Sequence, residues 1–290
     1  MRTINLDEWE LFGGGGEGDS YYHKTDKTIM LKLYKANALS DKTINDFNNS
    51  KELIKLGFNT PKAIERVTDG ERNGVIFERL PNKISMSKVM LYHPEMTEKC
   101  AVLMAKTLRK IHALHDTNKI FPLKNEGVKH VLGYGLKLQM INQKQYDDLM
   151  VKVCEYDNED NMVMMDPNPG NLVFAGELQE NGLPALTEEN LYIIDVGGFG
   201  RSTPLFDVAQ LYANRTGLIN PKIIEETSHL KFDIFSHFYE LVEKEYFQTD
   251  NLDYIHAQEE KSKAFAVFIM IGISLFMHID CSNEIKKILG

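Results

Sequence analysis

The sequence predicts an α+β fold in two lobes: a small antiparallel sheet with one helix, followed by a larger, mainly helical lobe. Two observations support this. Short strand-like runs separated by turn residues fill residues 1–80 and are interrupted by one helical pattern. After Pro81 the periodicity becomes helical. We therefore predict an N-terminal lobe over residues 1–80 and a C-terminal lobe over residues 81–290.

The N-terminal strands begin with a glycine-tipped hairpin. Its tip is the run Gly13 to Gly18, which contains five glycines and lies between strand-like residues 11–12 and 20–23. Further strands are predicted over residues 28–34, 63–67 and 74–80, each bounded by polar turn residues.

One helix is predicted within this lobe, over residues 40–56. Ser40 and Asp41 are suited to cap its start, and Gly57 and Pro61 would stop it. The apolar positions expected to lie roughly on one face of this helix are Ile44, Phe47, Leu53, Ile54 and Leu56.

The C-terminal lobe is expected to be helical except for the segment 162–195. In that segment two short apolar strands enclose a polar loop. An acidic loop at 157–161 precedes it. Between the two motif strands, residues 175–190 are expected to form an extended polar hairpin. Helices are predicted at 97–114, 139–156, 206–212, 221–246 and 264–277.

Composition limits the class of protein. With 290 residues and 43% hydrophobic content, the chain can bury a substantial core. A net charge of −9 without clustered lysine or arginine argues against a nucleic-acid partner.

Three widely spaced cysteines favour neither disulfides nor a cysteine metal site, and the N-terminus lacks a secretory pattern, so we expect a cytoplasmic protein. The apolar stretch 264–279 contains polar residues and is too short to span a membrane.

Three polar residues are the strongest chemical signal. Asp166 follows an apolar run, Asn171 lies five positions later, and Asp195 ends a second apolar run, Leu191 to Ile194. An aspartate in such a loop can accept the proton of a substrate hydroxyl, whereas amide and carboxylate oxygens suit the magnesium of a nucleotide. Each residue alone also fits a turn or a strand end. Together they predict phosphoryl transfer.

The N-terminal lobe offers residues for binding phosphate. The backbone N–H groups of Gly13, Gly14, Gly15 and Gly16 can approach phosphate oxygens without obstruction, although a glycine run also fits a flexible hairpin. Lys32, in the strand that follows the hairpin, can reach the α- and β-phosphates, or it can be an ordinary surface lysine.

A phosphate-binding lysine needs an acidic partner, and the helix that follows Lys32 supplies two candidates. Asp46 lies at about the right position along the chain, whereas Glu52 lies nearly two turns later and is equally an exposed helix charge. We prefer Asp46. Its shorter side chain requires the helix to approach the strand more closely.

With these residues in order, the chain resembles the aminoglycoside phosphotransferase and choline kinase group of the protein-kinase-like superfamily. Residues 166–171 match the end of its His-Gly-Asp-x-x-x-x-Asn loop, and Ile194-Asp195 matches its metal-binding strand end. Residues 108–114 and 195–207 resemble two further segments, so that the resemblance covers roughly residues 10–215. One departure is Met164-Met165, which stands where the group has His-Gly; the packing of Met164 could replace the support of that histidine.

The resemblance implies a two-lobed protein-kinase-like fold and an ATP- and Mg²⁺-dependent phosphotransferase acting on a small-molecule hydroxyl. Asp166 would be the catalytic base, Asn171 and Asp195 the metal ligands, and Lys32 the contact to the phosphates. Adenine would lie against the backbone of Glu78 and Leu80. Asp207 is interpreted as a structural residue that binds the catalytic-loop backbone, and His112 as a core or interlobe histidine.

The acceptor and the activity leave alternatives open. Acidic residues Asp157, Glu159 and Asp160 suit a cationic acceptor such as an amino sugar or amino alcohol, or they form a solvated face. A protein kinase is the second hypothesis, although no Ala-Pro-Glu-like segment follows Asp195. A non-catalytic nucleotide-binding protein is the third, and the missing His-Gly pair favours it. The sequence does not indicate the oligomeric state.

Overall fold

Residues 1–15, 18–36 and 41–290 are described by the computed structural model, and they divide into two units. One comprises Met1–Met86 and Pro169–Gly198, and we call it the sheet unit; the other comprises Ser87–Asn168 and Phe199–Gly290, and we call it the helical unit. The predicted ranges 1–80 and 81–290 differ from this division at 81–86 and 169–198. Segment 169–198 is tied to the sheet unit by hydrogen bonds from Asn49 Nδ2 to Val196 O and from the Ile193 N–H to Asn59 O, and strand pairing joins 81–86 to it.

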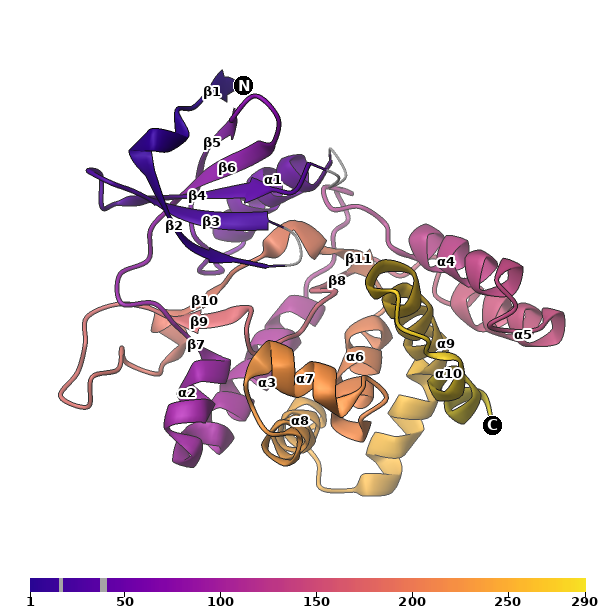
Figure 1. The fold of residues 1–290 in the computed structure, drawn as a ribbon. Helices are drawn as coiled ribbons and strands as arrows, with labels where there is room; N and C mark the ends of the chain where they lie inside the picture. Colours follow the sequence, from indigo (N-terminus) through magenta and orange to yellow (C-terminus); the bar gives the residue numbers. More distant parts are fainter. Residues whose placement is uncertain (16–17, 37–40) are drawn as a thin grey trace. The chain divides into compact units, whose positions relative to one another are not determined.

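The sheet unit is built on a six-stranded sheet with the order β1-β5-β6-β4-β3-β2 (Figure 1). β1 pairs with β5 in parallel, and all other neighbours are antiparallel. The predicted small antiparallel sheet is therefore confirmed, except for a short parallel first strand that the sequence pattern did not indicate. The strands are β1 (Arg2–Thr3), β2 (Trp9–Gly14), β3 (Gly18–His23), β4 (Ile29–Tyr34), β5 (Ala63–Thr68) and β6 (Asn73–Glu78), with a 3₁₀ turn η1 (Leu6–Glu8) before β2.

Alternation along β4 places its residues on two faces. Leu31 and Leu33 are fully buried in one cluster of the sheet, whereas Tyr34 belongs to a separate cluster on the other side. Because successive side chains of a strand point to opposite faces, Lys32 shares its face with Tyr34. The strand thereby delivers a lysine to a face that also carries a buried tyrosine.

The single helix of this unit, α1 (Asp41–Lys55), matches the predicted apolar face only in part. Leu53 is fully buried as expected, whereas Ile54 is 41% exposed and Leu56, just past the helix end, 45% exposed. The buried face also carries the polar residues Asp46, Asn49 and Ser50. The polar residues have backbone partners far along the chain: Ser50 Oγ donates to Pro61 O at 2.8 Å, and Asn49 Nδ2 donates to Val196 O at 2.9 Å. Gly57 ends the helix with φ +86°, as predicted; Ser40 lies outside the described residues.

A second, three-stranded sheet completes the unit, with the order β10-β9-β7. The connection between β9 and β10 was expected to be a polar hairpin, but it buries Leu183 and Leu186. These leucines give the connection an apolar anchor of its own. The elements are β7 (Ile84–Ser85), β9 (Leu172–Phe174), η3 (Glu188–Asn190), β10 (Leu191–Ile193) and η4 (Val196–Gly198).

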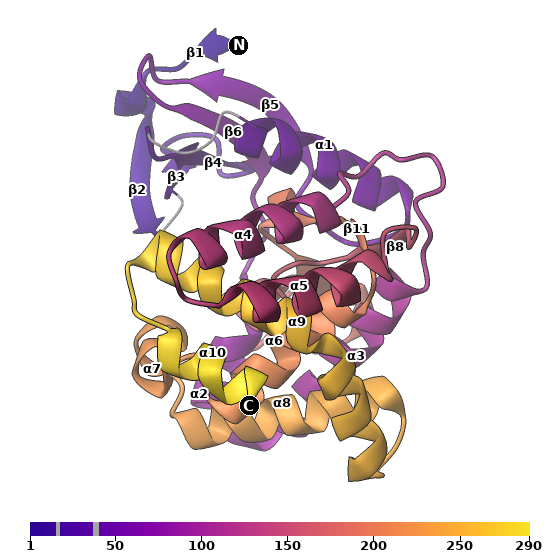
Figure 2. The same cartoon turned by 90° about the vertical axis from the view of Figure 1, so that its right-hand side faces the viewer.

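The helical unit packs its helices around a large apolar core. Phe206 and Phe265 lie near its centre, with ring centroids 5.5 Å apart. Figure 2 shows α4 and α5 running side by side next to α9. Besides α2 (Met86–Tyr92), at the junction of the two units, the elements are η2 (Pro94–Met96), α3 (Thr97–His112), α4 (Asn125–Lys137), α5 (Gln143–Cys154), β8 (Asn161–Val163), β11 (Gly200–Ser202), α6 (Leu205–Thr216), α7 (Pro221–Ser228), α8 (Phe232–Phe247), α9 (Leu252–Met277) and α10 (Ser282–Leu289).

Two differences from the predicted helices have local causes. The segment 221–246 is not one helix, because His229 adopts φ +60° and separates α7 from α8. α4 was not predicted, since three glycines lower its helical propensity. One of them, Gly135, allows close packing against α9: a Cβ there would lie 2.4 Å from Ile271 Cδ1, so the isoleucine side chain would have to shift. In the described part of the chain, no helix combines the length and apolarity of a membrane span.

Candidate active site

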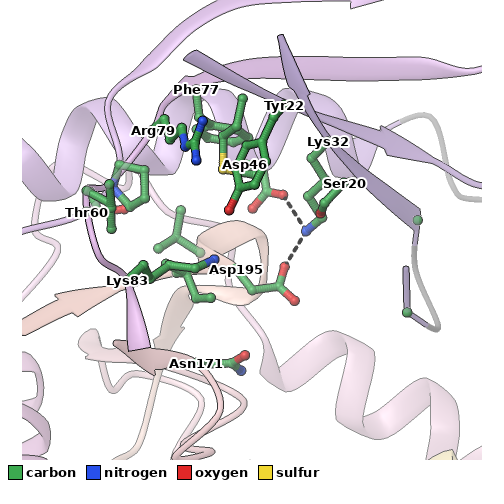
Figure 3. Close-up of a pocket in the computed structure, with 17 residues that line it drawn as sticks. Ser20, Tyr22, Lys32, Asp46, Thr60, Phe77, Arg79, Lys83, Asn171 and Asp195 are labelled. Carbon is green, nitrogen blue, oxygen red and sulfur yellow. Dashed lines mark hydrogen bonds and ion pairs between the residues drawn. The ribbon is translucent and has the colours of Figure 1, made fainter. Parts of the chain in front are cut away.

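The sheet unit contains a cavity of about 260 Å³ lined only by residues of that unit (Figure 3). Strands β3 and β4, helix α1 and the segment that follows β6 each contribute side chains. The remaining wall comes from the start of β9 and the end of β10, which supply Asn171 and Asp195. The cavity therefore collects residues that are far apart in the sequence.

Lys32 lies at the centre of the charged groups. Its Nζ is 3.1 Å from Asp46 Oδ2 and 2.7 Å from Asp195 Oδ1, and Figure 3 shows it between the two carboxylates. The Asp46 side chain is 3% exposed, whereas that of Asp195 is 38% exposed and accessible from the cavity. Glu52, the alternative partner, instead binds Lys55 at 2.7 Å. Of the two acidic candidates, the structure brings Asp46 to Lys32.

Backbone pairing places Asn171 beside Asp195. The Ile194 N–H donates to Asn171 O at 2.9 Å, continuing the antiparallel ladder of β9 and β10 by one step. Asp195 then adopts φ +58°, an uncommon conformation for a non-glycine residue, which breaks the ladder at the cavity wall. One carboxylate and one amide oxygen suit Mg²⁺, since this ion usually takes one or two protein oxygens and completes its shell with water and nucleotide phosphate.

The glycine loop contributes less of the cavity wall than predicted. Gly15 lines the cavity, whereas Gly13 and Gly14 belong to β2 and pair with β3, and neither is among the described lining residues. Gly16 lies outside the described residues. The sequence-based list omitted Gly18, which lines the cavity and whose carbonyl accepts the Gly15 N–H at 2.9 Å.

Gly18 has a steric requirement that gives a stability prediction. A Cβ on Gly18 would lie 2.2 Å from Leu33 O, whereas a Cβ on Gly13 would meet nothing within 4 Å. We expect Gly18→Ala to lower the free energy of unfolding by about 1–3 kcal/mol, because the rigid β3–β4 pairing must shift. Gly13→Ala, the matched control, should change it by less than about 0.5 kcal/mol. Urea denaturation measures both, and equal stabilities of the two variants would contradict the prediction.

The segment after β6 lies at the cavity, but not through all the predicted residues. Leu80 lines the wall, as do its neighbours Phe77 and Arg79, whereas Glu78 is not among the described lining residues. The Glu78 N–H donates to Lys62 O at 3.0 Å. Any contact from Glu78 to a base would therefore come from its carbonyl oxygen.

Sequence reasoning missed several side chains of the cavity, among them Tyr22, Arg79 and Lys83. Tyr22 stacks on Phe12 with ring centroids 3.7 Å apart, and the Arg79 guanidinium lies 3.7 Å from the centroid of the Tyr22 ring. Figure 3 shows Lys83 extending into the same space. Alternation along β3 was a usable signal for Tyr22, because Tyr22 shares a face with Ser20, which also lines the cavity.

In the helical unit, a buried network holds the loop that carries Asp166. Asp207 is fully buried and accepts the N–H groups of Met164 at 2.7 Å and Met165 at 2.8 Å. His112 Nε2 lies 2.9 Å from Asp207, and His112 Nδ1 lies 2.7 Å from the Tyr246 hydroxyl. The interpretations of Asp207 as a support of the loop backbone and of His112 as a core histidine are confirmed.

The same loop has two further supports. Met164 is 3% exposed, so it packs in the interior at the position where the related group has histidine. The Tyr239 hydroxyl donates to Pro167 O at 2.9 Å. Burial, and then the charge of Asp166, raise the pKa of Tyr239 well above its ordinary value, which keeps this hydroxyl protonated as a donor.

Two of the three acidic residues considered for a cationic acceptor, Asp157 and Asp160, already have partners within the helical unit. Asp157 binds Lys129 at 2.7 Å, and this side-chain hydrogen bond lowers the pKa of Asp157. Asp160 lies 2.6 Å from His115 Nδ1. The structure therefore gives Asp157 and Asp160 local roles in the loop.

Comparison with known proteins identifies the fold. No protein-family model matches the chain, and no curated protein matches its sequence. Solved structures do match over nearly the whole length, and they are kinases of small molecules. The fold that the resemblance implied, that of the aminoglycoside phosphotransferases, is confirmed.

Three structures illustrate the match. The gentamicin complex of APH(2")-IIa is 16% identical, covers 98% of this chain and 90% of its own, and gives a TM-score of 0.59. The streptomycin–ATP complex of the same protein is 16% identical, covers 99% and 91%, and gives 0.58. A putative fructosamine-3-kinase from Haemophilus somnus 129PT is 10% identical, covers 98% and 93%, and gives 0.57. At these identities the shared property is the fold.

Proposed function

We propose that this protein is an ATP- and Mg²⁺-dependent phosphotransferase that moves the γ-phosphate to a hydroxyl of a small molecule. The observation that carries the proposal is the meeting of Lys32, Asp46 and Asp195 in one cavity. A lysine held by a helix carboxylate beside a metal-binding aspartate is the arrangement that phosphoryl transfer requires. The shared fold supports it, since one matching structure holds ATP and streptomycin together.

The charged and polar residues of the cavity divide the binding of the nucleotide among them. Lys32 contacts the α- and β-phosphates, and Gly15 and Gly18, which carry no side chain, leave room for the phosphate oxygens at the cavity wall. Asn171 and Asp195 hold Mg²⁺, which neutralises charge on the phosphates when bound. The Leu80 backbone and the Glu78 carbonyl contact adenine, next to the stacked Tyr22 and Arg79 side chains.

Asp166 acts on the acceptor. Its carboxylate takes the proton of the acceptor hydroxyl as the hydroxyl oxygen forms a bond to the γ-phosphorus, and the bond from that phosphorus to the β-phosphate oxygen breaks to release ADP. The step needs positioning and charge neutralisation more than covalent help. The loop supports from Asp207 and Tyr239 serve this positioning, because they fix the backbone on either side of Asp166.

The acceptor class that we propose is a cationic amino sugar or amino alcohol. Gentamicin, streptomycin and kanamycin are named in matching structures, and fructosamine kinases also act on an amino-substituted sugar. The net charge of −9 favours a cationic small molecule through long-range attraction.

Thermal stability with and without Mg-ATP tests nucleotide binding. A ligand at about 100 times its Kd stabilises the folded state by about 2.7 kcal/mol, so we expect a clear rise in Tm. Asp195→Ala should abolish this rise, because it removes a metal ligand and a partner of Lys32. Glu65→Ala, which removes a surface carboxylate of the same unit paired with Arg2, should retain it.

Release of ADP across a panel of amino sugars, amino alcohols and protein substrates then tests transfer. We expect turnover with a member of the first two classes. An unchanged Tm in Mg-ATP, or a rise that survives Asp195→Ala, would contradict the proposal. Mg-ATP binding without turnover on any acceptor would instead indicate a non-catalytic nucleotide-binding protein.

A further inference from the structure

The acidic partner of Lys32 is an aspartate, and a second side chain of β4 holds it in place. Asp46 Oδ2 lies 3.1 Å from Lys32 Nζ, and the same oxygen accepts a hydrogen bond from the Tyr34 hydroxyl. Asp46 is 2% exposed and Tyr34 is 2% exposed. A buried carboxylate is costly unless hydrogen bonds satisfy it, so the tyrosine stabilises the ionised form that Lys32 needs.

Strand geometry explains why Tyr34 can do this. Lys32 and Tyr34 are two positions apart on β4, and Lys32 Nζ lies 4.8 Å from the centroid of the Tyr34 ring. The ring is buried in a cluster with Ala63, Val75 and Phe77, which leaves it little freedom to move. Its hydroxyl is therefore a fixed donor next to the lysine.

The opposite side of Asp46 is closed by the segment that follows Asp195. A Cβ on Gly197 would lie 2.8 Å from Asp46 Oδ1, so the bare glycine backbone leaves just enough room for the carboxylate. Asn49, one turn along α1, donates to Val196 O at 2.9 Å and keeps α1 against this segment. The short aspartate thus reaches Lys32 because α1 lies close on one side and Tyr34 fixes the carboxylate on the other.

We propose that Tyr34 is a positioning residue of the phosphotransferase site: its hydroxyl fixes the Asp46 carboxylate against Lys32 so that an aspartate can orient the phosphate-binding lysine. The inference rests on the proposed function for its consequence in catalysis. Its geometric part concerns only Tyr34, Asp46 and Lys32. A core tyrosine that merely finds a hydrogen-bond partner would have the same burial but no effect on Lys32.

Four proteins distinguish a positioning tyrosine from a core tyrosine without effect on Lys32: wild type, Tyr34→Phe, Asp46→Glu and the double variant. Tyr34→Phe removes one oxygen and keeps the ring. In that background Asp46→Glu adds one methylene, which lets the carboxylate reach Lys32 without the hydroxyl and fills the vacated space. Tyr21→Phe is the control, because Tyr21 lies on the neighbouring strand and its hydroxyl contacts Arg72, away from the cavity.

The first measurement needs no nucleotide. An amine-reactive reagent is added to each protein under native conditions, and mass spectrometry follows the rate of labelling at Lys32. We expect roughly tenfold faster labelling in Tyr34→Phe, as loss of a hydrogen bond to a charged group predicts. The rate should return toward wild type in the double variant and stay unchanged in Tyr21→Phe.

The second measurement is steady-state kinetics with Mg-ATP. Tyr34→Phe should raise KM for Mg-ATP about tenfold with a smaller change in kcat, and the double variant should recover most of this loss. Unchanged labelling of Lys32 in Tyr34→Phe, or an increase that Asp46→Glu does not reverse, would overturn the proposal. Labelling that follows the expected pattern in a protein that does not bind Mg-ATP would support Tyr34 as the residue that positions Asp46 and refute the phosphotransferase function.

Discussion

Asp166→Ala should lower kcat for phosphoryl transfer by roughly a hundredfold to ten-thousandfold while leaving the affinity for Mg-ATP nearly unchanged. The carboxylate accepts the proton of the acceptor hydroxyl in the proposed step, whereas the residues proposed to contact the nucleotide, Lys32, Asn171 and Asp195, line a cavity of the sheet unit. Removing the base should therefore raise the barrier of the chemical step alone. Single-turnover kinetics and titration with Mg-ATP measure the two properties separately.

Asp160→Ala is the matched control for this variant. Asp160 is another carboxylate of the helical unit, and it pairs with His115 instead of lying in the catalytic loop. Its removal should leave kcat within about twofold of wild type, since surface substitutions away from special features change little. An Asp166→Ala protein with full turnover would refute Asp166 as the base. Loss of Mg-ATP binding would show that Asp166 serves the nucleotide instead.

Asp207→Ala should produce the largest loss of stability, about 3–5 kcal/mol. The side chain is completely buried and satisfies the N–H groups of Met164 and Met165 together with His112. Alanine leaves all three donors without their acceptor in the interior, and each unsatisfied group costs about 1–3 kcal/mol. Urea denaturation of wild type and variant measures the loss.

Asp207→Asn provides the comparison that isolates the acceptor atoms. Asparagine keeps the shape and one of the two oxygens, so its loss of stability should be clearly smaller than that of alanine. Transfer activity should fall with both variants, because the loop that carries Asp166 loses its anchor. Equal stability of wild type and Asp207→Ala would contradict the role of this network.

Local patterns in the sequence were sufficient to predict much of the sheet unit. The alternation around Lys32 indicated β4, and the turn residues between the later strands indicated β5 and β6. The spacing of Lys32 and Asp46 along the chain was enough to propose a pair that the structure brings to 3.1 Å. Such features depend on residues close in sequence, where strand and helix periodicity apply directly.

Features that depend on distant backbone could not be predicted in this way. Apolar periodicity gave only part of the buried face of α1: Leu53 is buried as expected, but the polar Asn49 and Ser50 are buried beside it, with the carbonyls of Val196 and Pro61 as partners. Ile54 shows the consequence: it matched the apolar pattern, yet it is exposed. The requirement for glycine at Gly18 likewise arises from Leu33 O on the next strand and has no signal in the local sequence.

The cavity residues missed from the sequence show a similar limit. In the sequence Arg79 and Lys83 are ordinary polar residues near a lobe boundary. Only the folded chain shows that their side chains line the cavity. The role of Asp207 was easier to predict, since the aspartate of a Pro-x-x-Asp segment has a recognisable counterpart in the group that the sequence resembles. The hydrogen-bond partners of His112 could be found only from the structure, because Asp207 and Tyr246 are remote along the chain.

Transfer of a labelled γ-phosphate is the most direct test of a phosphotransferase centred on Lys32, Asp166 and Asp195. ATP labelled in the γ-phosphate is incubated with Mg²⁺, the protein and a mixture of amino sugars and amino alcohols, and mass spectrometry locates the label. We expect a phosphate ester on one acceptor hydroxyl with wild type, and none above background with Asp166→Ala or Asp195→Ala. Label found only in unreacted ATP and inorganic phosphate, or an ester formed equally by the variants, would contradict the proposed function.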